Sequence, residues 1–120
     1  MNFYPGVINP QVNEFGLHGT WKVTGQSATP VSAGATITSR FQAGRVYIVL
    51  TSPGGGSKTV RVQLDGHSIP ARQAGSDVHA GLVTVRGQRL YGLVSLSSAE
   101  QHTLTLALPP GVSAYSFTFG

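Results

Sequence analysis

The segment "SPGGGSKT" (52–59) is the part of the chain most similar to a known chemical motif, the glycine-rich loop that binds nucleotide phosphates. That motif needs Gly directly before Lys and a helix after it, because the helix N-terminus stabilises the phosphates. Here Ser57 precedes Lys58, and residues 59–64 alternate between polar and apolar side chains before the Asp-Gly pair at 65–66. This alternation predicts a strand that ends in a tight hairpin turn. The sequence therefore favours a connector between two strands over a nucleotide site.

Hydrolytic chemistry has two weak candidates. The segment "SDVH" (76–79) brings Ser, Asp and His together, but residues so close in sequence rarely form a catalytic triad, and the chain has no Gly-x-Ser-x-Gly elbow. A turn in which Asp77 accepts backbone N–H groups is the favoured interpretation. A glycosidase needs two facing carboxylates, whereas two of the four acidic residues, Asp65 and Asp77, are in predicted turns. We expect the chain not to be an enzyme, and a hydrolase is a distant third hypothesis.

Metal binding has limited support. The four histidines match no zinc-site spacing, and there is no Cys to complete a site: His18, His67, His79 and His102. Asp65 or Asp77 could join carbonyl oxygens at a calcium site, but solvated turn residues are the favoured interpretation. We therefore predict no cofactor and no metal, with these two carboxylates as weak calcium candidates.

Carbohydrate binding requires fewer specific residues than catalysis does. A sugar ring stacks its C–H face on an aromatic ring, and its hydroxyls bond to short polar side chains. The aromatic candidates are Trp21, Tyr47 and Tyr91, with Arg61 and Gln63 as polar partners on a strand face. Burial in the core is the competing interpretation of Trp21 and Tyr47, which both flank apolar strands.

The elements that would position these side chains are short strands. Alternating patterns predict strands at 17–24, 34–42, 45–52, 59–64, 67–70, 82–86, 89–96, 102–108 and 114–119. We expect a turn at Ala43-Gly44, a long polar loop at 71–80, and a central position for the strand 45–52, which is apolar on both faces. Tyr115, Phe117 and Phe119 share one face of the last strand and are expected in the core.

The fold prediction follows from these patterns. No segment has helical periodicity, so the sequence predicts an all-β protein, an antiparallel β-sandwich of jelly-roll type with eight or nine strands. Residues 1–16 are expected to be an irregular lead-in, and residues 17–120 a single domain.

Composition excludes several partners. The chain has 120 residues, only 10% of them charged, and its net charge of +4 reflects few acids, since its eight Lys and Arg residues are scattered. We expect no nucleic-acid partner. There is no Cys for a disulfide or thiol chemistry, no signal-peptide pattern at the start, and no apolar run long enough for membrane insertion by this segment.

The ordered series "GTW", "RFQAGRVYIVL", "VRVQLDG", "GSDVH", "LVTVRGQRLYGLV", "HTLTL" and "PPGVSAYSFTFG" resembles the C-terminal domain of DipZ-type thiol:disulfide interchange proteins. In that family the domain follows a thioredoxin-like domain and is similar to a carbohydrate-binding module; "NFYPGV" would be the junction between the two. The resemblance implies a non-catalytic accessory module in the periplasm or cell envelope, which binds glycan weakly or docks partners. The alternative is a structural module that braces the adjacent redox domain without binding sugar. Redox activity is not implied for this chain, because the Cys pair is absent.

Overall fold

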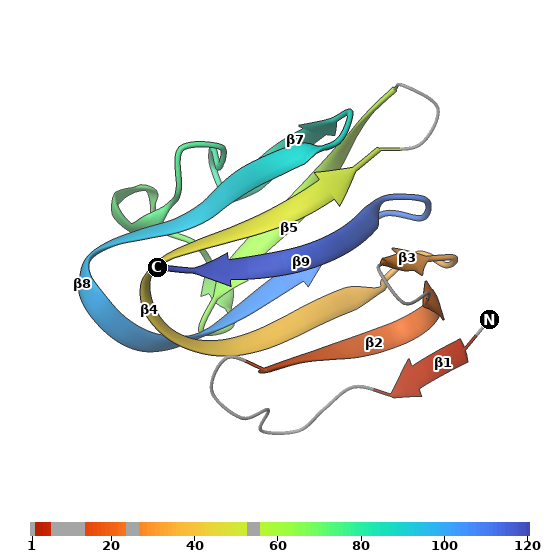
Figure 1. The fold of residues 1–120 in the computed structure, drawn as a ribbon, viewed down its shortest axis with the longest axis horizontal. Helices are drawn as coiled ribbons and strands as arrows, with labels where there is room; N and C mark the ends of the chain where they lie inside the picture. Colours follow the sequence, from red (N-terminus) through yellow and green to blue (C-terminus); the bar gives the residue numbers. More distant parts are fainter. Residues whose placement is uncertain (1, 6–13, 24–26, 53–55) are drawn as a thin grey trace.

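The computed structural model describes residues 2–5, 14–23, 27–52 and 56–120, which form one folded antiparallel sheet (Figure 1). Its nine strands are β1 (Asn2–Pro5), β2 (Glu14–Val23), β3 (Ala28–Pro30), β4 (Thr36–Thr51), β5 (Ser57–Leu64), β6 (His67–Ser68), β7 (Leu82–Arg86), β8 (Arg89–Ala107) and β9 (Ser113–Phe119). Within the described residues the helical structure is limited to the single turn η2 (Ala71–Gln73). The predicted all-β, antiparallel fold is confirmed.

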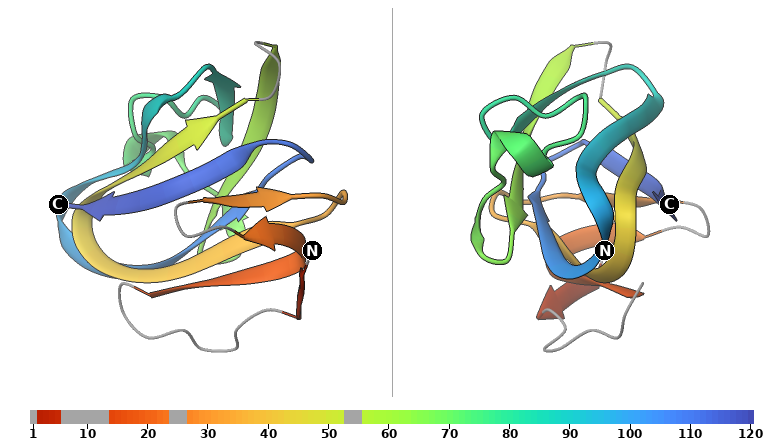
Figure 2. Two further views of the ribbon diagram at one scale, coloured as in Figure 1. Left: turned by 45° about the vertical axis from the view of Figure 1, so that its right-hand side comes forward. Right: turned by 90° about the vertical axis from the view of Figure 1, so that its left-hand side faces the viewer.

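Two long strands, β4 and β8, connect the two halves of the sandwich. The first part of β4 pairs with β2 and with the second part of β8, whereas the second part of β4 pairs with β9 and with the first part of β8. Figure 2 shows β4 and β8 bending together as they pass from one half to the other. The expected central position of residues 45–52 is confirmed, because this part of β4 lies between β8 and β9.

The predicted turn at Ala43-Gly44 is wrong. Residues 34–42 and 45–52 were expected as separate strands, but most of both segments belongs to the continuous strand β4; likewise most of 89–96 and 102–108 belongs to β8. Ala43 lies opposite Glu100 and Arg45 lies opposite Ser95, so the register shifts at the bend and residues 96–99 bulge from β8. The N–H groups of Gly44 and Arg45 both donate to the carbonyl of Gly120, at 2.8 and 3.0 Å. Gly44 therefore bends the strand without reversing it.

The start of the chain also differs from expectation. Residues 2–5 form β1, which pairs with residues 18–21 of β2, and β2 begins at Glu14 where Leu17 was expected. The predicted irregular lead-in is therefore wrong for residues 2–5 and 14–16, and its remaining residues, 1 and 6–13, lie outside the described residues. The short strand β3 was not predicted, because three residues are too few to show an alternating pattern.

The Asp-Gly hairpin is confirmed. Asp65 and Gly66 have φ angles of 53° and 84°, and Leu64 pairs with His67 across the two-residue turn. This is the geometry of a type I′ turn, which favours Asp-Gly because both central residues need positive φ. Lys58 lies within β5 opposite Val85 of β7, so a strand follows the glycine segment and not a helix. Residues 53–55 of that segment lie outside the described residues.

The core lies between the two halves of the folded sheet and follows the period-two pattern. Its aliphatic residues include Val46, Ile48 and Leu50 of β4, Val60 and Val62 of β5, Val83 and Val85 of β7, and Leu104 and Leu106 of β8. Phe117 packs against this core as expected, but Tyr115 is 37% exposed, which corrects its predicted burial. A register shift between Ile48 and Leu50 turns Ala114 inward in its place. The side chain of Phe119 lies outside the described part of the structure. In the described ranges, no helix is long and apolar enough to cross a membrane.

Candidate functional site

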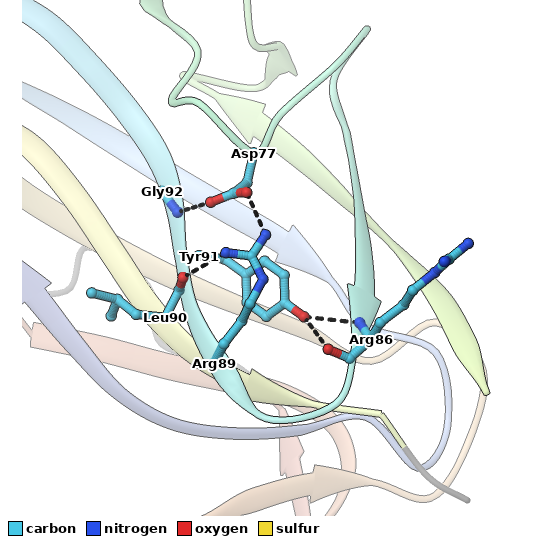
Figure 3. A network of polar contacts seen from close by, with 6 residues as sticks. All are labelled: Asp77, Arg86, Arg89, Leu90, Tyr91 and Gly92. Atoms are coloured by element: carbon cyan, nitrogen blue, oxygen red, sulfur yellow. Dashed lines mark hydrogen bonds and ion pairs between the residues drawn. The ribbon is translucent and has the colours of Figure 1, made fainter. Parts of the chain in front are cut away.

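Two of the three aromatic candidates for sugar stacking are in the core. Trp21 is fully buried, and its indole N–H donates to the carbonyl of His18 at 2.9 Å. Tyr91 is 1% exposed, and its hydroxyl donates to the carbonyl of Arg86 and accepts from the N–H of the same residue, both at 2.8 Å (Figure 3). Each ring can be buried because its polar tip has a partner. The prediction of Trp21 and Tyr91 as stacking platforms is therefore wrong.

The polar candidates Arg61 and Gln63 lie on the outer face of β5, with Arg61 exposed and Gln63 half-buried. They lie opposite Ala107 and Thr105 of β8, in the half of the sandwich that contains the second part of that strand. Tyr47 pairs with Gly92, near the other end of β8. The structure therefore does not bring these two polar side chains together with Tyr47.

Tyr47 lines a small surface pocket. The pocket has a volume of about 200 Å³ and is lined by Arg45 and Tyr47 of β4, Gly75 and Ser76 of the 74–79 loop, and Gly92, Val94 and Ser95 of β8. Tyr47 is half-buried and Arg45 is exposed, in contrast to their fully buried neighbour Val46, because alternate residues of β4 face outward. The lining thus includes one aromatic residue, one arginine and two serines.

Residues 74–77, which form the loop side of the pocket, are hydrogen-bonded to the edge of β8. The N–H of Gly75 donates to the carbonyl of Leu93 at 3.0 Å, and the N–H of Asp77 donates to the carbonyl of Gly92 at 3.3 Å. Ala74 forms an isolated bridge to Val94, so these residues extend the sheet by a short irregular segment. Sequence reasoning expected residues 71–80 to be a long polar loop and missed this contact. A glycine in the middle of a strand, here Gly92, was the available signal, because it often marks a close approach by another backbone.

The carboxylate of Asp77 fixes the loop from the other side (Figure 3). Its Oδ2 accepts the N–H of Gly92 at 2.8 Å, and its Oδ1 accepts from the Arg89 guanidinium at 2.5 Å. Partial burial alone would raise the pKa of Asp77, but the hydrogen bonds from Gly92 and Arg89 together outweigh it and lower the pKa below its ordinary value. Asp77 was expected to accept backbone N–H groups of its own turn, but the N–H that it accepts is that of Gly92 on the neighbouring strand β8.

Arg89 connects this carboxylate to the core. Its guanidinium carbon lies 4.2 Å from the centre of the Tyr91 ring, within the range of a cation–π contact. The hydrogen bond to Asp77 raises the pKa of Arg89, so its positive charge is retained at any working pH. A continuous series of contacts therefore runs from the pocket loop through Asp77 and Arg89 to the buried ring of Tyr91.

The other acidic candidate, Asp65, belongs to a separate cluster. Its Oδ1 accepts the N–H of Thr103 at 2.9 Å, and its Oδ2 lies 2.5 Å from Nδ1 of His102, whose Nε2 lies 2.9 Å from Oε1 of Glu100. Partial burial lowers the pKa of His102, but the hydrogen bonds to Asp65 and Glu100 together raise it above its ordinary value. Partial burial also raises the pKa of Asp65, and the bonds from Thr103 and His102 together lower it. The cluster joins the β5–β6 turn to β8. Among the described residues, no group of three or more His, Cys, Asp or Glu side chains has the arrangement of a metal site.

The family model for the thioredoxin like C-terminal domain matches residues 2–120. The chain belongs to this family. The match includes residues 2–16, which were expected to precede the domain. The sequence has no match among curated proteins.

Solved structures share the fold of this thioredoxin like C-terminal domain. A family two carbohydrate esterase from Cellvibrio japonicus aligns with 88% of the chain at a TM-score of 0.64 and 14% identity. An active site mutant of a family two carbohydrate esterase from Clostridium thermocellum aligns with 90% at 0.67 and 18% identity. A structure described as a family two carbohydrate esterase from Clostridium thermocellum in complex with cellohexaose aligns with 83% at 0.61 and 18% identity. The chain spans 29–31% of the length of those chains.

Proposed function

We propose that this thioredoxin like C-terminal domain is a non-catalytic accessory module that binds carbohydrate weakly through the pocket around Tyr47. The supporting observation is the composition of that pocket. The half-buried Tyr47 shares the lining of the pocket with Arg45, Ser76 and Ser95. An aromatic ring offers an apolar face to the C–H groups of a sugar, and the polar side chains offer hydrogen bonds to its hydroxyls.

The size of the pocket favours weak binding. Its volume of about 200 Å³ is below the range of roughly 300–1,000 Å³ typical of sites that enclose a drug-sized ligand. One aromatic contact contributes on the order of 1 kcal/mol, and a few exposed hydrogen bonds add a similar amount each. We expect a Kd of roughly 0.1–1 mM for an oligosaccharide.

The proposed cellular context is an extracytoplasmic thioredoxin-like protein of the DipZ type, in the periplasm or cell envelope. The family description and the order of the sequence motifs support this context. A thioredoxin-like domain of the same native polypeptide would perform thiol:disulfide interchange, and the present domain would position it near glycan. The absence of Cys from the sequence supports a role without thiol chemistry for this domain.

A titration followed by NMR tests the glycan function. We expect envelope-type oligosaccharides to shift the resonances of residues around Tyr47, and Tyr47→Ala to remove these shifts. Tyr115→Ala is the control, because Tyr115 is an exposed tyrosine that lies on β9 and does not line the pocket. Shifts that survive Tyr47→Ala, or that require Tyr115, would contradict the assignment of the pocket.

The family description also favours a second candidate function, in which the domain braces or orients an adjacent redox domain and binds no sugar. This alternative predicts that oligosaccharides leave the spectrum unchanged, whereas a thioredoxin-like domain added to the sample shifts the resonances of one face. A hydrolase is the weakest candidate. The segment 76–79 suggested a catalytic triad, but the carboxylate of Asp77 accepts hydrogen bonds from Arg89 and from the N–H of Gly92.

A further inference from the structure

One charged residue, Arg45, lines the pocket around Tyr47, and its charge is positive. Resting on the carbohydrate-binding function proposed above, we infer that the pocket prefers a sugar that carries a carboxylate, such as a uronic acid, with Arg45 as its selectivity-determining residue. A uronic acid presents a planar carboxylate on the same ring whose C–H face would stack on Tyr47. The inference depends on the position of Arg45, on the pairing of Asp77 with Arg89, and on the space beside Gly92.

Arg45 is the charged residue among those that line the pocket; the others are glycines, serines, Val94 and Tyr47. The backbone of Arg45 is held on both sides by Gly120, through a 3.0 Å bond to its N–H and a 2.9 Å bond to its carbonyl. Its exposed side chain has no ion pair with any residue that the structure describes. A guanidinium presents parallel N–H donors that match the two oxygens of a carboxylate. The backbone of Arg45 is therefore fixed, and the N–H groups of its guanidinium can donate to a ligand.

The carboxylate of the pocket loop, that of Asp77, does not compete for Arg45. Asp77 follows the pocket residue Ser76, but its Oδ1 accepts from Arg89 and its Oδ2 accepts from the N–H of Gly92. Figure 3 shows both contacts of the Asp77 carboxylate. Because Arg89 balances Asp77, this carboxylate does not compensate the positive charge of Arg45. An anionic ligand is favoured over a neutral one by this arrangement.

The space for the ligand exists because residue 92 is glycine. A methyl group at Gly92 would lie 3.3 Å from Oγ of Ser76 and 3.5 Å from Cε1 of Tyr47, so it would occupy the floor between these two side chains. The contact with the Ser76 hydroxyl is tight but adjustable, and Gly92 is not one of the glycines with positive φ. Gly92→Ala therefore should reduce the room in the pocket while the fold remains intact.

A matched pair of ligands isolates the contribution of charge. Methyl glucuronide and methyl glucoside share a pyranose ring and differ in the carboxylate, so both are titrated into the whole chain and followed by NMR. We expect the glucuronide to bind up to about fivefold more tightly, the range for an exposed ion pair. The preference should disappear in Arg45→Gln and decrease as sodium chloride is raised.

Arg86→Gln is the matched control, because it removes one positive charge from an exposed residue outside the pocket. Figure 3 shows the Arg86 side chain pointing away from the Asp77–Arg89 pair. The Arg86 variant should keep the preference for glucuronide, whereas Gly92→Ala should weaken the binding of both glycosides. If Arg86→Gln removes the preference as well, the effect is one of net charge and the assignment to Arg45 is overturned.

The remaining outcomes separate this inference from the function on which it rests. Equal affinity for the two glycosides, with binding lost in Tyr47→Ala, would overturn the preference for a carboxylate and leave carbohydrate binding intact. No shift with either glycoside or with the longer oligosaccharides would overturn both.

Discussion

A methyl group on Gly75 would lie 2.4 Å from the carbonyl carbon and the carbonyl oxygen of Gly92, so these two residues bring the 74–77 segment into direct backbone contact with β8. Real Cβ atoms essentially never approach other atoms within 3.0 Å. The contact is therefore possible only with glycine at position 75. It places Ser76 beside the outer face of β4 and β8, where it lines the pocket with Tyr47.

The first prediction concerns this contact. We expect Gly75→Ala to lower the free energy of unfolding by about 1–3 kcal/mol, because the methyl group must displace backbone atoms of β8. Urea denaturation followed by fluorescence measures the change. Gly44→Ala is the control, since the nearest atom to a methyl group there is 3.7 Å away. Equal destabilisation by the two variants would show that the Gly75–Gly92 contact has no special importance.

The second prediction concerns the buried hydroxyl of Tyr91. Tyr91→Phe keeps the ring in the core but leaves the N–H of Arg86 without its 2.8 Å acceptor. We expect a loss of about 1–3 kcal/mol in the free energy of unfolding, the cost of an unsatisfied buried polar group. Tyr115→Phe should change stability by less than about 0.5 kcal/mol, because Tyr115 is exposed. A similar small effect of both substitutions would contradict the bridging role of Tyr91.

The local elements of this fold were predictable from the sequence because their causes are local. The strand 82–86 was predicted with the bounds that β7 has, and the Asp65-Gly66 turn follows from the positive φ that both residues adopt. The strand predicted from the alternation in 59–64 is part of β5, and its apolar residues Val60, Val62 and Leu64 are buried. These features depend on neighbouring residues in the chain.

The features that the sequence did not reveal depend on distant partners. Ala43-Gly44 has the composition of a turn, and only its pairing with the bulged part of β8 and the bonds to Gly120 make it a bend within β4. The burial of Trp21 and Tyr91 depends on acceptors in His18 and Arg86 that no pattern identifies. The pocket needs the docking of the 74–77 segment, so Tyr47 could be named as a candidate but Arg45 and Ser76 could not.

The third prediction concerns pH. The pKa of His102 is raised in the folded state, so its contribution to stability is complete below its unfolded pKa of about 6.5 and is lost as pH rises through its folded pKa. The pKa of Asp65 is lowered, so its contribution is present above its unfolded pKa of about 3.9 and is lost as pH falls through its folded pKa. The cluster therefore stabilises the fold most between these two unfolded pKa values.

Urea midpoints at about pH 5.5 and pH 8.5 test this prediction. The wild type should lose more stability over this interval than His102→Gln, because the variant has no imidazolium to lose its proton. The difference should be small, since the side chains of Asp65 and Glu100 are 50% and 44% exposed. His79→Gln, which removes an exposed His from the 74–79 loop, should retain the wild-type pH dependence. Parallel pH profiles for the wild type and His102→Gln would contradict the prediction.

The fourth prediction concerns the glycine-rich segment. Lys58→Ala should leave the fold intact and should not change any affinity for ATP, because Lys58 is exposed on a strand that pairs with β7. A strand provides no helix dipole to hold a phosphate. Circular dichroism checks the fold, and calorimetric titration checks the nucleotide. Saturable ATP binding at micromolar concentration that the substitution abolishes would refute the connector role of this segment.

The fifth prediction concerns calcium. Asp65 and Asp77 were the weak candidates for calcium ligands, but His102 and Thr103 occupy the oxygens of one, and Arg89 and Gly92 occupy those of the other. A cation would have to displace Arg89 or His102 and meet their positive charge. We therefore expect the Tm to be the same in millimolar calcium and in a chelator. If calcium raises the Tm, Asp65→Asn and Asp77→Asn identify the site. A calcium effect that Asp77→Asn removes would mean that the ion replaces Arg89 as the partner of this carboxylate.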